Sequence, residues 1–74
     1  MQITVKLFAS FRAGRFVRDT RTIAAGTRIA DIAAALDIGL SEIGIIMVNG
    51  RHADSDQELQ DGVTLSLFPL LGGG

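Results

Sequence analysis

The residues best suited to chemistry stand at the end of the chain, where Gly72, Gly73 and Gly74 follow one another. Consecutive glycines have no side chains to bury in a core, and they lose more conformational entropy on ordering than other residues. What they offer is a thin peptide that ends in a carboxylate, and three extended residues reach roughly 10 Å. Such a thread can place a carboxyl group in a narrow pocket of another protein. A frayed chain end is the alternative interpretation.

The other potentially reactive residues lack the partner residues that catalysis or metal binding requires. His52 is the only histidine, and it follows a turn sequence, so it is either a solvent-facing residue or a rim contact for a partner. Asp54, Asp56 and Glu58 lack the spacing and the glycine of a calcium loop. The chain has no cysteine, and no serine has an evident base partner. We therefore expect no intrinsic catalytic residue, no metal site and no bound cofactor.

Length and composition indicate one small domain in a soluble, cytoplasmic protein. The chain has 74 residues, of which 47% are hydrophobic, and its net charge is −1. No apolar stretch is long enough to cross a bilayer, and no global charge attracts nucleic acid, so we expect neither membrane nor nucleic acid as a partner. The charges are unevenly placed: acids crowd into residues 54–61, and four arginines lie close together at Arg12, Arg15, Arg18 and Arg21. They form either two solvated loops or a polarised surface that orients a partner.

Strands are expected at the start of the chain. Residues 2–8 alternate, with Ile3, Val5 and Leu7 on one face, which is typical of a half-buried strand. Residues 9–14 are predicted to be a connection. Residues 15–24 are polar and β-branched, and they suit the second strand of a hairpin with Val17 and Ile23 facing inward.

A single amphipathic helix follows. Ile29, Ile32, Ala33 and Leu36 form one apolar face at helical spacing. Thr27 is predicted to be the N-cap and Gly39 the C-terminal stop. So short a helix is not stable alone in water, so it must pack against a sheet.

The second half of the chain predicts three more strands. Residues 45–48 form a strand, the Asn49-Gly50 pair predicts a tight hairpin turn, and residues 51–53 form a short return strand. Leu59 is expected to anchor the following polar segment in the core. The last strand begins at Val63, directs Val63, Leu65 and Leu67 inward, and stops at Pro69.

This order predicts an α+β fold, with one main helix on one face of a mixed sheet of four or five strands. The last strand is expected to lie centrally, beside the first. The domain would span residues 1–71, and residues 72–74 would form a flexible tail.

Because the single helix would cover only one face of the sheet, apolar residues would remain on the other, open face. If Leu7 and Leu67 face the helix, alternation directs Phe8, Met47 and Phe68 to the other side, and Ile45 can join them. Aromatic and Met side chains are enriched at protein interfaces. Loops folded over these residues, or a strand shifted by one position, would be the alternative. The residues predicted to bind partners are Phe8, Arg12, Met47, His52, Phe68, Leu70 and Leu71.

Several segments carry a pattern together: residues 7–14 read Leu-Phe-Ala-Ser-Phe-Arg-Ala-Gly, residues 25–36, 48–50 and 59–62 hold the helix start and later turns, and residues 68–74 hold a phenylalanine, a proline and the terminal glycines. Through these segments the chain resembles the MoaD/ThiS family of ubiquitin-like sulfur carriers over essentially its whole length. Residues 7–14 are similar to the Leu-Phe-Ala-x-x-Arg-x-x-Gly opening of the molybdopterin branch of the family. No single segment is specific, but their order and spacing together are.

The resemblance implies a β-grasp fold and a carrier role. An E1-like enzyme would adenylate the Gly74 carboxylate with ATP, and a persulfide or sulfurtransferase donor would convert it to a thiocarboxylate. The tail would then deliver sulfur in the active site of a synthase large subunit. The carrier would be a substrate of enzymes, not an enzyme, although it can be the small subunit of a synthase complex.

Several functions stay open at the level of sequence. The opening favours molybdenum or tungsten pterin cofactor synthesis, whereas the third glycine is more common in the thiamine branch. A β-grasp module that acts only through its surface is a further candidate, and so is a protein modifier linked through Gly74 to lysines.

Overall fold

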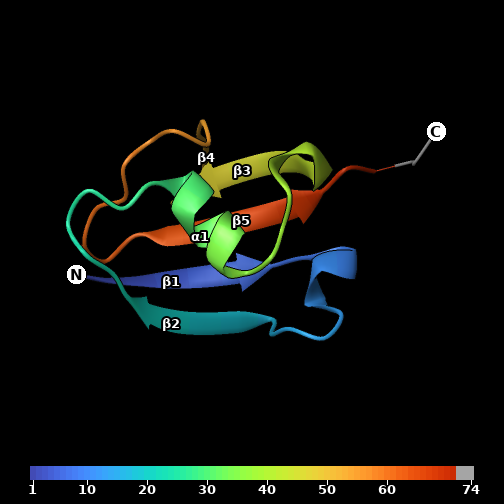
Figure 1. The fold of residues 1–74 in the computed structure, drawn as a ribbon, viewed down its shortest axis with the longest axis horizontal. Helices are drawn as coiled ribbons and strands as arrows, with labels where there is room; N and C mark the ends of the chain where they lie inside the picture. The colour runs from blue at the N-terminus through green and yellow to red at the C-terminus, as the bar shows by residue number, and fades with distance from the viewer. Residues whose placement is uncertain (72–74) are drawn as a thin grey trace.

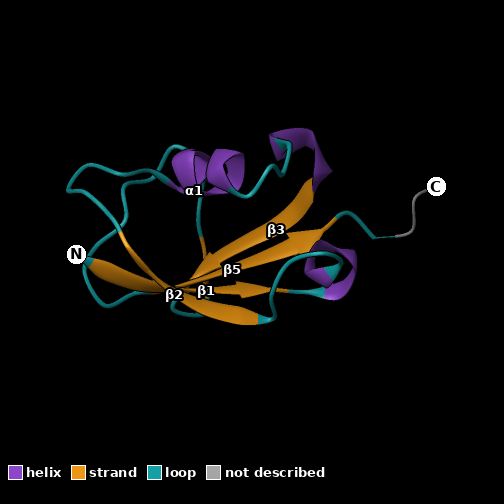
Figure 2. Cartoon of the chain, turned by 60° about the horizontal axis from the view of Figure 1, so that its bottom comes forward, coloured by secondary structure: helices purple, strands orange, loops and turns teal. Residues whose placement is uncertain are grey.

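The structure of the protein is a computed structural model, and it describes residues 1–71. A five-stranded mixed sheet in the order β2-β1-β5-β3-β4 lies behind helix α1 (Ile29–Ala35) in Figure 1. The strands are β1 (Gln2–Leu7), β2 (Arg18–Thr22), β3 (Ile43–Val48), β4 (Arg51–His52) and β5 (Thr64–Pro69). Two 3-10 helices, η1 (Ala9–Arg12) and η2 (Leu40–Glu42), follow β1 and precede β3. The predicted mixed sheet with one main helix is confirmed, and Figure 2 shows α1 on one side of the sheet.

Strand β5 lies at the centre of the sheet, as predicted. It runs parallel to β1, where Val5 pairs with Leu65, and antiparallel to β3, where Ile46 pairs with Leu67. The last strand along the chain therefore joins the two hairpins β1-β2 and β3-β4 into one sheet.

The core lies between α1 and the sheet, and alternation along the strands fills it. The predicted inward residues of β1 and β5 are all buried, and Leu59 is only 2% exposed, as predicted. The buried hydrophobic residues that form the core are Ile3, Val5, Leu7, Phe11, Ile29, Ile32, Ala33, Leu36, Ile38, Leu59, Val63, Leu65 and Leu67.

The segment between β1 and β2 differs from the prediction. Phe11 lies in η1 and is buried, so the expected plain connection contributes a core side chain. Strand β2 is shorter than the predicted residues 15–24, and Val17 is 55% exposed, so its inward orientation was wrong. Phe16 packs against the core just before this position. Phe11 and Phe16 thus fill this end of the core, which Val17 was expected to do.

Both ends of α1 also differ from the prediction. Its N-cap is Arg28, not Thr27, and the Asp31 carboxylate accepts a hydrogen bond from the Arg28 backbone N–H at 2.9 Å. The Thr27 hydroxyl instead donates to the Ala24 carbonyl. The helix ends before Gly39, at Ala35 with Leu36 as its C-cap, and the next residue, Asp37, takes the left-handed conformation with φ 59°.

The carbonyl groups at the C-terminal end of α1 accept hydrogen bonds from the residues that follow the helix and from an arginine distant in sequence. The Ile38 N–H donates to the Ala33 carbonyl at 2.9 Å, which is the long bond of a Schellman-type ending. The Arg15 side chain donates to the carbonyls of Phe11, Leu36 and Asp37. Arg15 therefore ties η1 to the end of α1.

The β3-β4 hairpin has the predicted turn. Asn49 and Gly50 have φ values of 51° and 78°, as a type I′ turn requires, and the Asn49 Oδ1 also accepts from the Thr64 N–H at 2.8 Å. Strand β3 begins two residues earlier than predicted, because Ile43 pairs with Pro69 at the end of β5.

Candidate functional site: the open face and the exit of β5

The face of the sheet away from α1 carries a cluster of apolar side chains. Phe8 and Phe68 stack with ring centroids 4.1 Å apart and an angle of 12° between the ring planes. Ile45 is the register partner of Phe68, and Met47 follows on the same face of β3. All four are half-buried. We call Phe8, Ile45, Met47 and Phe68 the apolar patch.

Arg12 is held against this patch from η1. Its Nε donates to the Leu7 carbonyl at 2.7 Å, and its guanidinium carbon lies 5.3 Å from the centroid of the Phe8 ring. A cation at this distance from an aromatic face is attracted by the ring quadrupole. The structure therefore brings Arg12, Phe8 and Phe68 together in one stack.

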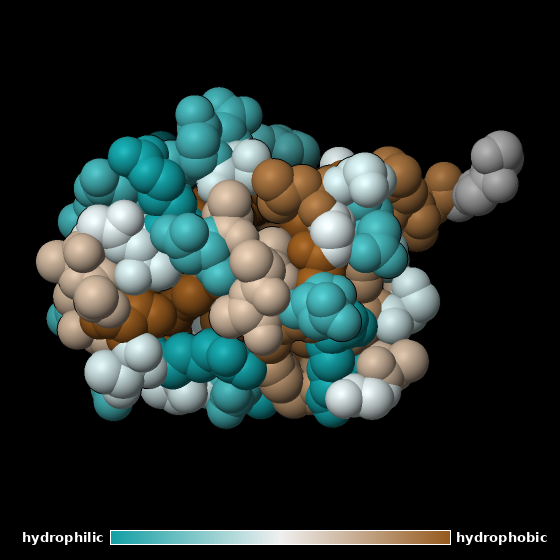
Figure 3. Space-filling model, in the orientation of Figure 1, coloured by the Kyte–Doolittle hydropathy of each residue, from teal (hydrophilic) through white to brown (hydrophobic). Residues whose placement is uncertain are grey.

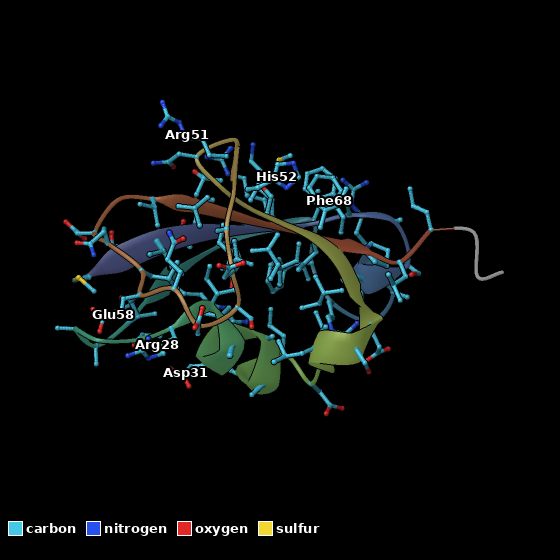
Figure 4. The ribbon with its side chains drawn as sticks, turned by 90° about the horizontal axis from the view of Figure 1, so that it is seen from above. Arg28, Asp31, Arg51, His52, Glu58 and Phe68 are labelled. Carbon is cyan, nitrogen blue, oxygen red and sulfur yellow. The ribbon has the colours of Figure 1, made fainter. Side chains whose placement is uncertain are left out.

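His52 lies at the other end of the patch. It pairs with Met47 across the β3-β4 hairpin and is exposed. Figure 4 shows His52 and Phe68 on the same side of the sheet, opposite α1. The predicted rim position of His52 is thus next to the patch, while its use by a partner stays a prediction.

The chain leaves the sheet at one end of β5, close to Phe68. The Leu70 N–H donates to the Glu42 carbonyl at 3.0 Å, which fixes the first residue after the strand. Leu70 is 62% and Leu71 82% exposed. Figure 3 shows hydrophobic surface where the described chain ends. The predicted exit residues are therefore accessible.

Gly44 is a residue of this site that sequence reasoning did not single out. A Cβ at this position would lie 2.9 Å from the Pro69 carbonyl oxygen and 3.1 Å from the Leu70 Cα, which is closer than real Cβ contacts. The pairing of β3 with β5 shifts register here, between Ile43 and Ile45. The signal was present in the sequence, because a glycine inside an apolar strand marks a bulge or a close backbone approach.

Gly72, Gly73 and Gly74 lie outside the described residues, so their predicted role stays a prediction. Within residues 1–71, no group of histidine, cysteine or acidic side chains has the arrangement of a metal site. In this part of the chain, no helix combines the length and the apolar character that crossing a membrane requires.

The sheet order, the single helix and the patch on the open face together define a ubiquitin-like protein of the β-grasp class. The chain belongs to the ThiS family, whose model matches residues 5–74. No curated protein matches it in sequence.

Solved structures support the same class. A putative molybdopterin converting factor, subunit 1, from Pyrococcus furiosus is 27% identical, with a TM-score of 0.73 over 93% of this chain and 97% of that one. Small archaeal modifier protein 1 of Haloferax volcanii is 23% identical, with a TM-score of 0.75 over 92% and 95% of the two chains. A third similar chain comes from the complex of subunits 1 and 2 of the molybdopterin-converting factor of Helicobacter pylori 26695. It is 20% identical, with a TM-score of 0.68 over 100% of both chains.

Proposed function

We propose that this chain is a sulfur carrier whose Gly74 carboxylate is adenylated, converted to a thiocarboxylate and used as a sulfur donor. The observation that carries the proposal is the exit of β5. The chain passes from a fully buried Leu67 in the central strand to the exposed Leu70 and Leu71 after it, directly beside the apolar patch. Family membership over residues 5–74 supports the same role for the glycines that follow.

The chemistry suits a terminal carboxylate held outside the core. A carboxylate is a poor electrophile, so its oxygen first attacks the α-phosphorus of ATP, which forms an acyl-adenylate and releases pyrophosphate. Sulfide then attacks the acyl carbon and displaces AMP, which leaves a thiocarboxylate. Glycines let the tail enter a narrow active site because no side chain obstructs it. ATP and the catalytic groups belong to an E1-like activating enzyme, and no residue of this chain is assigned a catalytic role.

The apolar patch is the proposed docking surface for the activating enzyme and for a synthase large subunit. Docking of the folded body raises the effective concentration of the tail at the partner's active site. Burying Phe68 on a partner contributes roughly 1.5–3 kcal/mol by transfer from water alone. Because Phe68 is directly followed by the exit residues, binding at the patch and insertion of the tail can occur together.

We infer that the sulfur goes to molybdenum or tungsten pterin cofactor synthesis. The opening at residues 7–14 and the likeness to the Pyrococcus protein support this pathway. Thiamine thiazole synthesis is the second candidate, which the third glycine favours. Feeding the thiocarboxylated chain to a pterin synthase large subunit and to a thiazole synthase, and measuring which one forms product, separates the two.

The carrier role is tested by intact-mass spectrometry. The chain is incubated with the E1-like enzyme of its own organism, ATP and sulfide, and its mass should rise by the difference between one sulfur and one oxygen atom. Deletion of Gly74 should abolish this change while the circular dichroism spectrum stays the same, because the core lies within residues 1–71. An unchanged mass of the full chain with an active enzyme, or sulfur uptake by the truncated chain, would contradict the proposal.

A further inference from the structure

The open face carries a pair of like charges in direct register. Lys6 on β1 and Arg18 on β2 are cross-strand partners. Lys6 alternates to the face opposite the core, since its neighbours Val5 and Leu7 are fully buried on the other side, and Arg18 shares this face as its register partner. Like charges directly opposite one another destabilise a sheet. This pair therefore opposes folding, and fold stability does not explain its presence.

Acidic residues are missing from the same face of the described strands. The strand residues that alternate away from the core are Gln2, Thr4, Lys6, Arg18, Thr20, Thr22, Ile45, Met47, His52, Thr64, Ser66 and Phe68. Asp19 is the one acid within a strand, and it pairs with the buried Val5, so it lies on the helix side. Its carboxylate is 3.4 Å from Arg21 there.

The cations border the apolar patch. Lys6 lies two residues before Phe8 and therefore on the same face, and Arg12 covers the Phe8 ring. Figure 4 shows His52 beside Phe68, on the side opposite α1. Although the net charge of the whole chain is −1, the open face thus has an apolar centre bordered by positive charge.

We propose that the open face recognises a protein surface in which an apolar centre is bordered by carboxylates, and that Lys6 and Arg18 contact this acidic border. The occupant is the docking surface of the activating enzyme, so the inference rests on the proposed function for the identity of the partner. Complementary charges at a border raise the association rate and select among partners. Nucleic acid is the less suitable occupant, because Phe8 and Phe68 stack on each other and do not form two separate platforms for bases.

The test uses Lys6→Glu, which should maintain or increase the stability of the fold while it weakens binding to the activating enzyme. The substitution places an opposite charge across from Arg18, so the melting temperature should stay equal or rise. The KM of the activating enzyme for the chain should rise by about tenfold at low ionic strength, with kcat unchanged. The wild-type KM should also rise between about 0.05 and 0.5 M NaCl, and the variant should lose most of this dependence because salt screens exposed charges.

Strand β2 supplies a matched control. Arg18→Gln and Arg21→Gln remove the same charge from the same strand, but Arg21 pairs with the buried Ile3 and lies on the helix side. Arg18→Gln should raise KM several-fold, whereas Arg21→Gln should leave it unchanged. Equal effects of the two variants would show that net charge acts, not this face, and would overturn the inference.

Two further results would also overturn it. One is a KM and a salt dependence that Lys6→Glu leaves unchanged while the wild-type chain is thiocarboxylated normally. The other is binding of a single-stranded oligouridylate that is tighter than enzyme binding and depends on Lys6. Failure of the wild-type chain to acquire sulfur would instead contradict the proposed function, so the two failures are distinguishable.

Discussion

The two faces of the sheet use their charged side chains in different ways. On the helix side, Arg15 donates to three backbone carbonyls, and Asp31 accepts from the N-cap of α1. On the open side, neither Lys6 nor Arg18 forms an ion pair with a carboxylate of residues 1–71. Arg15 and Asp31 complete the fold on the first face, whereas Lys6 and Arg18 on the second remain available to an outside molecule.

The apolar side chains show the same contrast. Leu65 and Leu67 of β5 are fully buried under α1, whereas Phe68 is only half-buried on the other face. Core residues stabilise the fold by complete removal from water, while a half-buried aromatic pair retains surface that a partner can cover. A single strand thus serves folding with one set of residues and, in the proposed function, binding with the other.

The sharpest test of this contrast compares two neighbours on β5. Leu67→Ala should lower the free energy of unfolding by about 2–5 kcal/mol, because it leaves a cavity in the core. Phe68→Ala should cost about 1 kcal/mol, mainly from the lost stacking with Phe8, but should strongly reduce thiocarboxylation by the activating enzyme. Urea unfolding and enzyme assays measure the two effects. Equal losses of stability would place the apolar patch in the core and remove the contrast.

A second test concerns the close approach between β3 and the exit of β5. Gly44→Ala should cost about 1–3 kcal/mol, since its Cβ would press on the Pro69 carbonyl oxygen. It should also shift the amide resonance of Leu70, whose N–H bonds to Glu42. The matched control is Gly39→Ala, where the nearest atom is the end of the flexible Glu42 side chain at 3.1 Å. An unchanged Leu70 resonance in Gly44→Ala would show that Gly44 does not direct the exit.

The smallest expected effect compares two arginines near the start of β2. Arg15→Met should cost about 1–2 kcal/mol in the free energy of unfolding, because two carbonyls at the end of α1 and the Phe11 carbonyl of η1 lose a donor. Arg18→Met should change it by no more than about 0.5 kcal/mol. Thermal unfolding of the two variants measures this difference in stability. A larger loss from Arg18→Met would mean that the open face also holds the fold together.

Much of the fold could be predicted because its strongest signals are local. Alternation identified β1 and β5, the Asn49-Gly50 turn fixed the β3-β4 hairpin, and the chain order placed β5 in the centre. The errors lie where distant residues decide local structure. The end of α1 depends on Arg15, from before β2, and the orientation of Val17 depends on how Phe11 and Phe16 fill the core.

The candidate site was predictable in part for the same reason. The alternation of side chains along the strands placed Phe8, Met47 and Phe68 on one face, but the geometry of these side chains depends on the register between strands distant in sequence. The 4.1 Å stack of Phe8 on Phe68 follows from the parallel register of β1 with β5. The roles of Lys6, Arg18 and Gly44 also needed the pairing of strands distant in sequence. The use of the patch and of Gly74 by partners stays a prediction.

The central place of β5 has a consequence for protein synthesis. While the ribosome still holds residues 64–69, the nascent chain contains two hairpins that no strand connects, and the Phe8 ring has no Phe68 to stack on. Pairings so distant in sequence form late in folding. An incompletely translated chain therefore cannot display the assembled apolar patch. If this patch is the docking surface, as we propose, such a chain does not compete with finished molecules for partner enzymes.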